Sequence, residues 1–110
     1  MAAGQLGEFE VLVLMAVLRL GDEAYPPGVR AVIEERTGRA AARGAVYVTL
    51  DRLETKRLLV SRLEDADPGV GGRPRRFYRP SPRGLRALQR TMAGMERMRQ
   101  GLERLLVIDP

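Results

Sequence analysis

Apolar residues follow the period of an α-helix in four parts of the chain. Residues 6–20 are apolar on nearly every side, and Gly21 is placed to end that helix. Pro26 and Pro27 suit the first turn of a second helix, which we expect to stop at Gly38. A helix that is apolar all round must be covered all round. We therefore expect residues 6–20 to be covered partly by their own domain and partly by a second subunit.

A third helix is predicted over residues 44–57, with one packed face and one free face. At 100° per residue, Val46, Leu50 and Leu53 fall within a narrow arc. The opposite face gathers Gly44, Val48, Asp51, Arg52 and Thr55. Two helices joined by a short link, the second with a polar outer face, are typical of a helix-turn-helix.

A β-hairpin with a glycine-rich tip is predicted next, with residues 58–64 and 75–79 as its strands. In the second strand, Arg76 and Tyr78 share one face and Phe77 lies on the other. We therefore expect only one aromatic side chain to enter the core, and Tyr78 is the candidate.

The last helix is expected to begin with Ser81 as its N-cap and Pro82 in its first position, and to run to about Leu106. Apolar residues recur along it every three or four positions, interrupted only at Arg99. Such a seam favours a dimer built from the first and last helices, although it could instead pack on its own domain. The residues expected at the dimer contact are Leu6, Phe9, Leu85, Leu88, Met92, Met95 and Leu102.

Helix, helix, helix, hairpin, helix is the element order of a winged helix-turn-helix domain. We therefore predict a mainly α fold of the α+β kind, with a two-stranded wing and a long C-terminal dimerisation helix. Residues 1–80 would form the winged-helix domain, and residues 81–110 the dimerisation helix.

Positive charge is concentrated in the last part of the chain. The 110 residues have a net charge of +5, but residues 1–70 hold nine basic and eleven acidic groups. Residues 71–110 hold ten basic and three acidic groups. All but one of the basic residues are arginines, whose planar guanidinium suits phosphates and guanine edges. No acid lies between Pro68 and Met95, so nothing there would repel a polyanion.

The wing of such a domain reaches the backbone or minor groove of DNA, and its third helix enters the major groove. A turn at residues 71–72 would let Arg73 approach a narrow groove, while Arg75, Arg76 and Arg79 could neutralise phosphates. The alternative is a solvated hairpin whose charge protects its edge strands from aggregation.

Around the third helix, each candidate contact also has an ordinary structural interpretation. Arg39 and Arg43 suit phosphate anchoring at the helix N-terminus, or are surface charge. Tyr47 could pack or donate its hydroxyl to a phosphate, and Val48 could touch a thymine methyl or be a scattered exposed valine. Arg52 could reach DNA or pair with an acid of its own helix. The full set of expected DNA contacts is Arg39, Arg43, Gly44, Tyr47, Val48, Arg52, Gly72, Arg73, Arg75 and Arg76.

Catalysis is disfavoured by what the chain lacks. Without cysteine or histidine there are no thiolate nucleophiles, no usual zinc sites and no histidine proton shuttle. The acids of "EERTG" and "EDAD" fall at a helix end and a hairpin turn, and no GxxxxGK motif occurs. We expect no enzymatic activity, cofactor or metal. The apolar run at residues 11–18 is too short to cross a membrane, so we expect a cytoplasmic, nucleoid-associated protein.

The sequence resembles the PadR family of transcriptional regulators, and its short final helix is similar to the compact branch of that family. The matching stretches, in family order and spacing, are residues 6–25, 33–39, 44–63 and 71–84. The resemblance implies a homodimeric repressor of promoter DNA, which a small effector releases in many members. Twofold symmetry would make the operator an inverted repeat.

Carried over by position, Tyr47 falls on the recognition-helix tyrosine of the family, and Gly72 and Arg73 fall on its wing tip. Ala42 departs from the family pattern, because a serine able to cap the third helix is common there. The Pro26-Pro27 pair at the entry of the second helix is a second departure, and Pro80 is a third. None of these three departures removes a DNA-facing group.

The small effector implied by the resemblance would be apolar and would bind between the subunits. This chain has no tryptophan to hold a flat aromatic molecule there. Phe9, Met92 and Met95 could line such a cavity, or could simply be core residues. The alternative function is a winged-helix module that binds protein without specific DNA binding.

Overall fold

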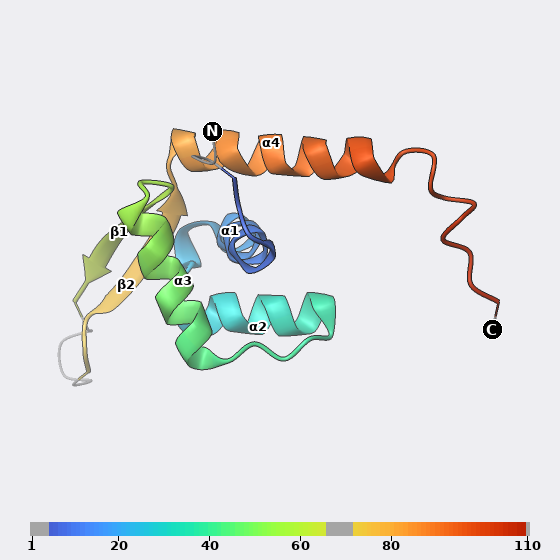
Figure 1. The fold of residues 1–110 in the computed structure, drawn as a ribbon. Helices are drawn as coiled ribbons and strands as arrows, with labels where there is room; N and C mark the ends of the chain where they lie inside the picture. Colours follow the sequence, from blue (N-terminus) through green and yellow to red (C-terminus); the bar gives the residue numbers. More distant parts are fainter. Residues whose placement is uncertain (1–4, 66–71, 110) are drawn as a thin grey trace.

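The fold is seen in Figure 1, a computed structural model that describes residues 5–65 and 72–109. Four helices and a two-stranded antiparallel sheet make it mainly helical, so the predicted winged helix-turn-helix with a two-stranded wing is confirmed. The elements in chain order are α1 (Glu8–Leu20), the 3-10 helix η1 (Gly21–Glu23), α2 (Pro26–Thr37), α3 (Arg43–Thr55), β1 (Leu59–Glu64), β2 (Arg75–Pro80) and α4 (Pro82–Arg99).

Helix α1 passes through the middle of the fold, with α4 on one side and α2 on the other (Figure 1). Its inner side is fully buried at Val13, Leu14 and Val17, where residues of α2, α3, α4 and both strands complete the core. On its outer side, Leu12 and Met15 are only partly buried. The domain therefore covers α1 on one side and leaves the other side partly open.

The wing is tied to the link between α1 and α2. Tyr78 is buried in the core, as predicted, and its backbone N–H donates to the carbonyl of Ala24 (2.8 Å). The prediction that only one aromatic side chain of this strand enters the core is confirmed, although Phe77 is also buried, on the opposite face of the wing. Its face of the wing is covered by Tyr25, at 5.7 Å between ring centroids, and by Arg62, neither of which adjoins Phe77 in sequence. The predicted turn at Gly71 lies outside the described residues.

The start of α4 is fixed to the turn between α3 and β1. Ser81 caps the helix as predicted, because its Oγ accepts from the N–H of Gly84 (3.0 Å). The N–H of Ser81 donates to the carbonyl of Leu58 (3.0 Å). A Cβ added at Gly84 would lie 2.0 Å from that same carbonyl oxygen. Only glycine lets α4 approach the Leu58 backbone so closely.

Helix α4 ends at Arg99, so the prediction that it runs to about Leu106 is wrong. Gln100 leaves the helical conformation and Gly101 adopts a φ of 87°, a left-handed geometry that favours glycine and ends the helix. Beyond it the chain forms turns, in which the N–H groups of residues 105 and 106 donate to the carbonyl of Leu102. The predicted helical seam therefore stops at Met95, because Leu102 and Leu106 lie outside the helix.

Candidate nucleic-acid interface

Helix α3 presents to solvent the polar face that its sequence predicts. Its inner face buries Val46, Leu50 and Leu53 in the core, with Thr49 beside them. Val48 points away from the core and is 55% exposed. The exposed face carries Gly44, Val48, Asp51, Arg52 and Thr55. This face combines donors, acceptors and one apolar group, which is the mixture that reads base edges in a major groove.

The N-terminus of α3 has no capping side chain. Ala42 is the N-cap residue, with extended backbone, and its methyl side chain cannot accept a hydrogen bond from the N–H groups of the first turn. The N–H groups of the first turn can therefore donate to an anion. Arg43 occupies the first helical position, so its guanidinium adds to the positive end of the helix dipole. The arrangement suits a phosphate oxygen.

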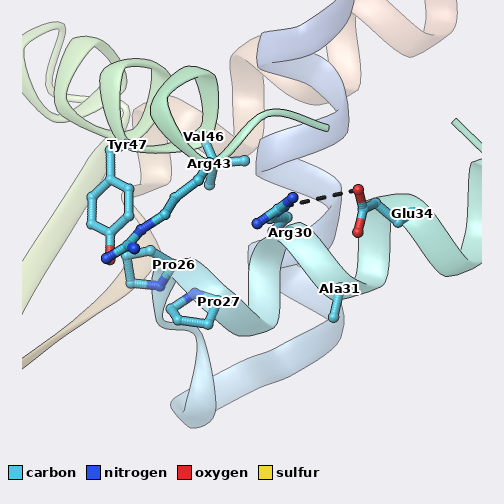
Figure 2. A pocket seen from close by; sticks show the side chains of 8 residues that line it. All are labelled: Pro26, Pro27, Arg30, Ala31, Glu34, Arg43, Val46 and Tyr47. Atoms are coloured by element: carbon cyan, nitrogen blue, oxygen red, sulfur yellow. Dashed lines mark ion pairs between the residues drawn. The ribbon is translucent and has the colours of Figure 1, made fainter. Parts of the chain in front are cut away.

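Arg43 and Tyr47 lie together at a hollow of about 480 Å³ between α2 and α3 (Figure 2). The guanidinium carbon of Arg43 is 5.6 Å from the centroid of the Tyr47 ring, and Tyr47 is 39% exposed. Pro26 and Pro27, in the first turn of α2, line the same hollow. Tyr47 therefore packs against a surface arginine rather than in the core. Donation of its hydroxyl to a phosphate stays a prediction.

Two side chains that the sequence analysis missed fix the turn between α2 and α3. Arg30 Nε donates to the carbonyl of Ala41 (2.7 Å), and the N–H of Ala41 donates to Glu34 Oε2 (3.0 Å). Arg30 and Glu34 also form an ion pair across one helical turn (3.8 Å; Figure 2). Together they bind both backbone polar groups of Ala41, just before α3. The four-residue spacing of Arg30 and Glu34 can be read from the sequence. The sequence does not show that both side chains bind the backbone of Ala41.

The wing carries its positive charge close to α3. The hairpin runs beside this helix (Figure 1), and β1 packs against it. Arg76 Nη1 donates to Ser61 Oγ (2.8 Å), and the Ser61 hydroxyl donates to Glu54 of α3. Arg75 lies over the ring of Tyr25, with its guanidinium carbon 5.8 Å from the centroid. The predicted wing contacts are all exposed: Gly72, Arg73, Arg75, Arg76 and Arg79.

Arg39 is separated from the other predicted contacts. Its guanidinium pairs with Glu8 and lies 6.0 Å from the centroid of the Phe9 ring, at the start of α1. Arg52, by contrast, is exposed on the free face of α3. Among residues 5–65 and 72–109, it forms no ion pair with an acid of its own helix. DNA contact by either arginine stays a prediction.

A buried carboxylate joins α1 to the end of α3. Glu10 is 7% exposed and accepts hydrogen bonds from the N–H of Gly7 and from Lys56 Nζ, both at 2.9 Å. Burial by itself would raise the pKa of Glu10. The hydrogen bonds from Lys56 and Gly7, with the charges of Lys56 and Arg52, outweigh burial and lower the pKa. The pair therefore supports the helix that carries the candidate interface.

An apolar groove of about 540 Å³ lies between α1 and α4. Leu6, Met92 and Met95, three residues expected at a dimer contact, line it together with Val11, Leu12 and Met15. Glu8, Thr91, Glu96 and Arg99 also line it. Phe9, expected with the two methionines around an effector, lies instead beneath Arg39. Leu88 belongs to the core of its own chain, whereas Leu85 is exposed.

Within residues 5–65 and 72–109, no helix is long and apolar enough to cross a membrane. No group of three or more acidic, histidine or cysteine side chains there is placed to hold a metal ion.

Solved structures with the same fold come from several bacteria. A PadR-family transcriptional regulator from Eggerthella lenta DSM 2243 is 27% identical, with a TM-score of 0.69 over 93% of this chain and 88% of that one. A PadR-family regulator from Clostridium difficile R20291 is 19% identical, with a TM-score of 0.72 over 92% and 100%. A PadR-like regulator from Bacillus cereus ATCC 14579 is 18% identical, with a TM-score of 0.72 over 92% and 93%. The last two show the fold alone.

Family membership follows from the sequence match. No curated protein matches the chain significantly. The model of the family described as "Transcriptional regulator PadR-like family" matches residues 14–90, which span α3, the wing and the start of α4. That family consists of regulators rather than enzymes, so the expectation of a non-enzymatic protein is confirmed. With a free-faced third helix beside a basic wing, and with most of its length matched, this chain belongs to the PadR-like family of transcriptional regulators.

Proposed function

We propose that this PadR-like regulator is a homodimeric repressor that binds an inverted-repeat operator in promoter DNA. The observation that carries the proposal is the combination of the exposed face of α3, its uncapped N-terminus and the exposed wing arginines on the neighbouring hairpin. In this function α3 reads bases through residues such as Val48 and Arg52. The wing arginines and Arg43 bind phosphates, which supply most of the affinity and its salt dependence.

The proposed dimer interface is the apolar surface of α4 that the single chain leaves exposed to solvent. Leu85, Met92 and Met95 are 45%, 46% and 68% exposed along α4, and the last two border the apolar groove beside α1. A second copy would cover this surface, with Leu6, Phe9 and Leu102 at its margins. Twofold symmetry would then present two α3 helices to half-sites about 34 Å apart, or one turn of DNA. Residues 81–110 would be the main dimerisation unit.

Release by a small apolar effector is the regulatory part of the proposal. The groove between α1 and α4 holds Met92 and Met95, whose flexible side chains adapt to ligands of different shape. Phe9 lies beneath Arg39 and does not line the groove, so the proposed effector contacts are the two methionines. A ligand there would act on DNA binding through the dimer geometry. The protein would work in the cytoplasm, on the nucleoid.

Selection of bound sites from a random duplex pool tests the DNA-binding part. We expect an enriched palindrome whose half-sites lie one DNA turn apart, and binding to it that weakens steeply with salt. A duplex with one half-site scrambled is the matched control and should bind much more weakly. Absence of salt-dependent duplex binding would contradict the proposal and favour a protein-binding module instead.

Sedimentation tests the proposed dimer, and a reporter gene tests the proposed repression. The chain should sediment as a dimer at working concentration, and sedimentation as single chains would contradict the symmetry argument. A reporter gene placed behind the selected palindrome should lose expression when the protein is present. Increased expression would instead indicate an activator.

A further inference from the structure

We propose that Tyr25 is a positioning residue for DNA binding, which holds the guanidinium of Arg75 in place and couples the wing to the start of α2. The inference rests on the proposed function and names a residue that the exposed surface alone does not indicate. Tyr25 is the N-cap residue of α2 and is partly buried.

Four side chains from three segments form a continuous stack, here called the wing stack: Tyr25, Arg62, Arg75 and Phe77. Arg62 contacts Phe77, Phe77 contacts Tyr25, and Tyr25 contacts Arg75. The guanidinium carbon of Arg62 is 4.8 Å from the centroid of Phe77. The Phe77 and Tyr25 centroids are 5.7 Å apart with an interplanar angle of 40°. The guanidinium carbon of Arg75 is 5.8 Å from the centroid of the Tyr25 ring.

The strand register places these side chains on one face of the wing. Arg62 and Phe77 are direct cross-strand partners, and Arg75 lies two residues before Phe77 on the same face. Tyr78 points to the opposite face, into the core. The wing is therefore held on both of its faces, by the core on one and by Tyr25 on the other.

Further contacts attach the wing to the residues just before Tyr25. Arg62 Nη2 donates to the carbonyl of Asp22 (3.0 Å) and pairs with Glu64 (3.3 Å), the cross-strand partner of Arg75. The N–H of Tyr78 donates to the carbonyl of Ala24. Tyr25 thus stands where the wing meets the link between α1 and α2.

Stacking leaves an arginine able to bind phosphate. A guanidinium that stacks flat on an aromatic ring keeps its N–H groups in its own plane, where they can still donate. A guanidinium already held in one place also loses less side-chain entropy when it binds. Arg75 is exposed, so its N–H groups can reach solvent or DNA.

Tyr25 also adjoins the second DNA-facing element. Pro26 and Pro27 follow it directly and line the hollow that contains Arg43 and Tyr47 at the start of α3 (Figure 2). One residue therefore relates the basic wing to the N-terminus of the recognition helix. The Tyr25 ring is uncharged, so it contributes to DNA binding by positioning Arg75 and not by attracting phosphate.

A double-mutant cycle on the full-length protein tests the inference, with the selected operator duplex as the probe. Tyr25→Leu should weaken binding about two- to fivefold, the range expected for an exposed cation–π contact. Tyr25→Phe keeps the ring and should bind within about twofold of wild type. In an Arg75→Ala background, Tyr25→Leu should add little, because the partner it positions is absent. Additive effects would overturn the inference.

Two conservative variants keep the test decisive even if Tyr25→Leu unfolds. Arg75→Lys keeps the charge but loses the planar stack, and should weaken binding about two- to fivefold. Arg36→Lys is the control, because Arg36 is exposed on α2 and lies outside both the wing stack and the proposed DNA contacts, and this variant should bind DNA as wild type does. Wild-type affinity in Arg75→Lys, or an equal loss in Arg36→Lys, would overturn the inference while leaving the proposed function intact. Failure of the wild-type protein to bind any duplex would instead overturn the proposed function, and the inference with it.

Discussion

Replacing Gly84 with alanine separates two opposing effects in α4. In an ordinary helix interior, alanine is about 1 kcal/mol more favourable than glycine. At Gly84, however, the new Cβ would lie 2.0 Å from the carbonyl oxygen of Leu58, and ordinary contact begins near 3.4 Å. The two backbones would have to separate by about 1.4 Å. The Ser81 N–H to Leu58 hydrogen bond would be strained or lost.

The expected magnitude follows from these contacts. Forcing an extra methyl group into a packed site costs about 1–3 kcal/mol, and a lost hydrogen bond adds about 1 kcal/mol. The sum of the overpacking cost and the lost hydrogen bond exceeds the gain in helix propensity. Gly84→Ala should therefore lower the free energy of unfolding by about 2 kcal/mol.

Gly94 in the same helix is the matched control. A Cβ there would meet only the end of the Arg97 side chain, at 3.7 Å. Gly94→Ala should therefore keep the propensity gain and raise the free energy of unfolding by about 1 kcal/mol. Urea unfolding followed by circular dichroism measures both variants. Total protein concentration must be held constant, because dimerisation would contribute to stability. If Gly84→Ala stabilised the protein as Gly94→Ala does, the close approach of α4 to Leu58 would be refuted.

Three further perturbations probe the wing, the buried carboxylate and the open face of α4. Arg73→Ala should weaken binding to every duplex and reduce the slope of log affinity against log salt by about 1, whereas Arg36→Ala on α2 should not. Equal slopes would argue against the wing contact. Glu10→Gln should be less stable than wild type at neutral pH. Because the folded pKa of Glu10 is lowered, that stabilisation is present above the unfolded pKa and lost as pH falls through the folded value. The stability difference should therefore narrow in acid unfolding below about pH 4.5, and a constant difference would contradict the role of the charge. Met95→Glu should shift sedimentation towards single chains, and an unchanged dimer would exclude Met95 from the interface.

Local pattern was enough to predict most of the fold. The inward arc of Val46, Leu50 and Leu53 located α3, and Ser81 with Pro82 located the start of α4, because these signals depend only on residues within one or two turns. The end of α4 was missed, since the apolar spacing continues past Gly101 while the backbone does not.

The features that the sequence analysis missed depend on partners distant in the chain. Phe77 is buried because Tyr25 and Arg62 cover it. Likewise, Arg39 turns towards Glu8, 31 residues earlier, rather than towards the start of α3. Periodicity assigns a side chain to a face of its own element, but only tertiary packing decides what lies opposite that face.

The missing cap at the start of α3 has a consequence for the order in which this regulator becomes rigid. Ala42 gives the first turn no acceptor, so in the free protein those N–H groups are left to water. A phosphate from the operator would supply the acceptor that the chain itself omits. The double helix would then complete the protein's own secondary structure, and amide exchange at Gly44 and Ala45 would slow upon binding.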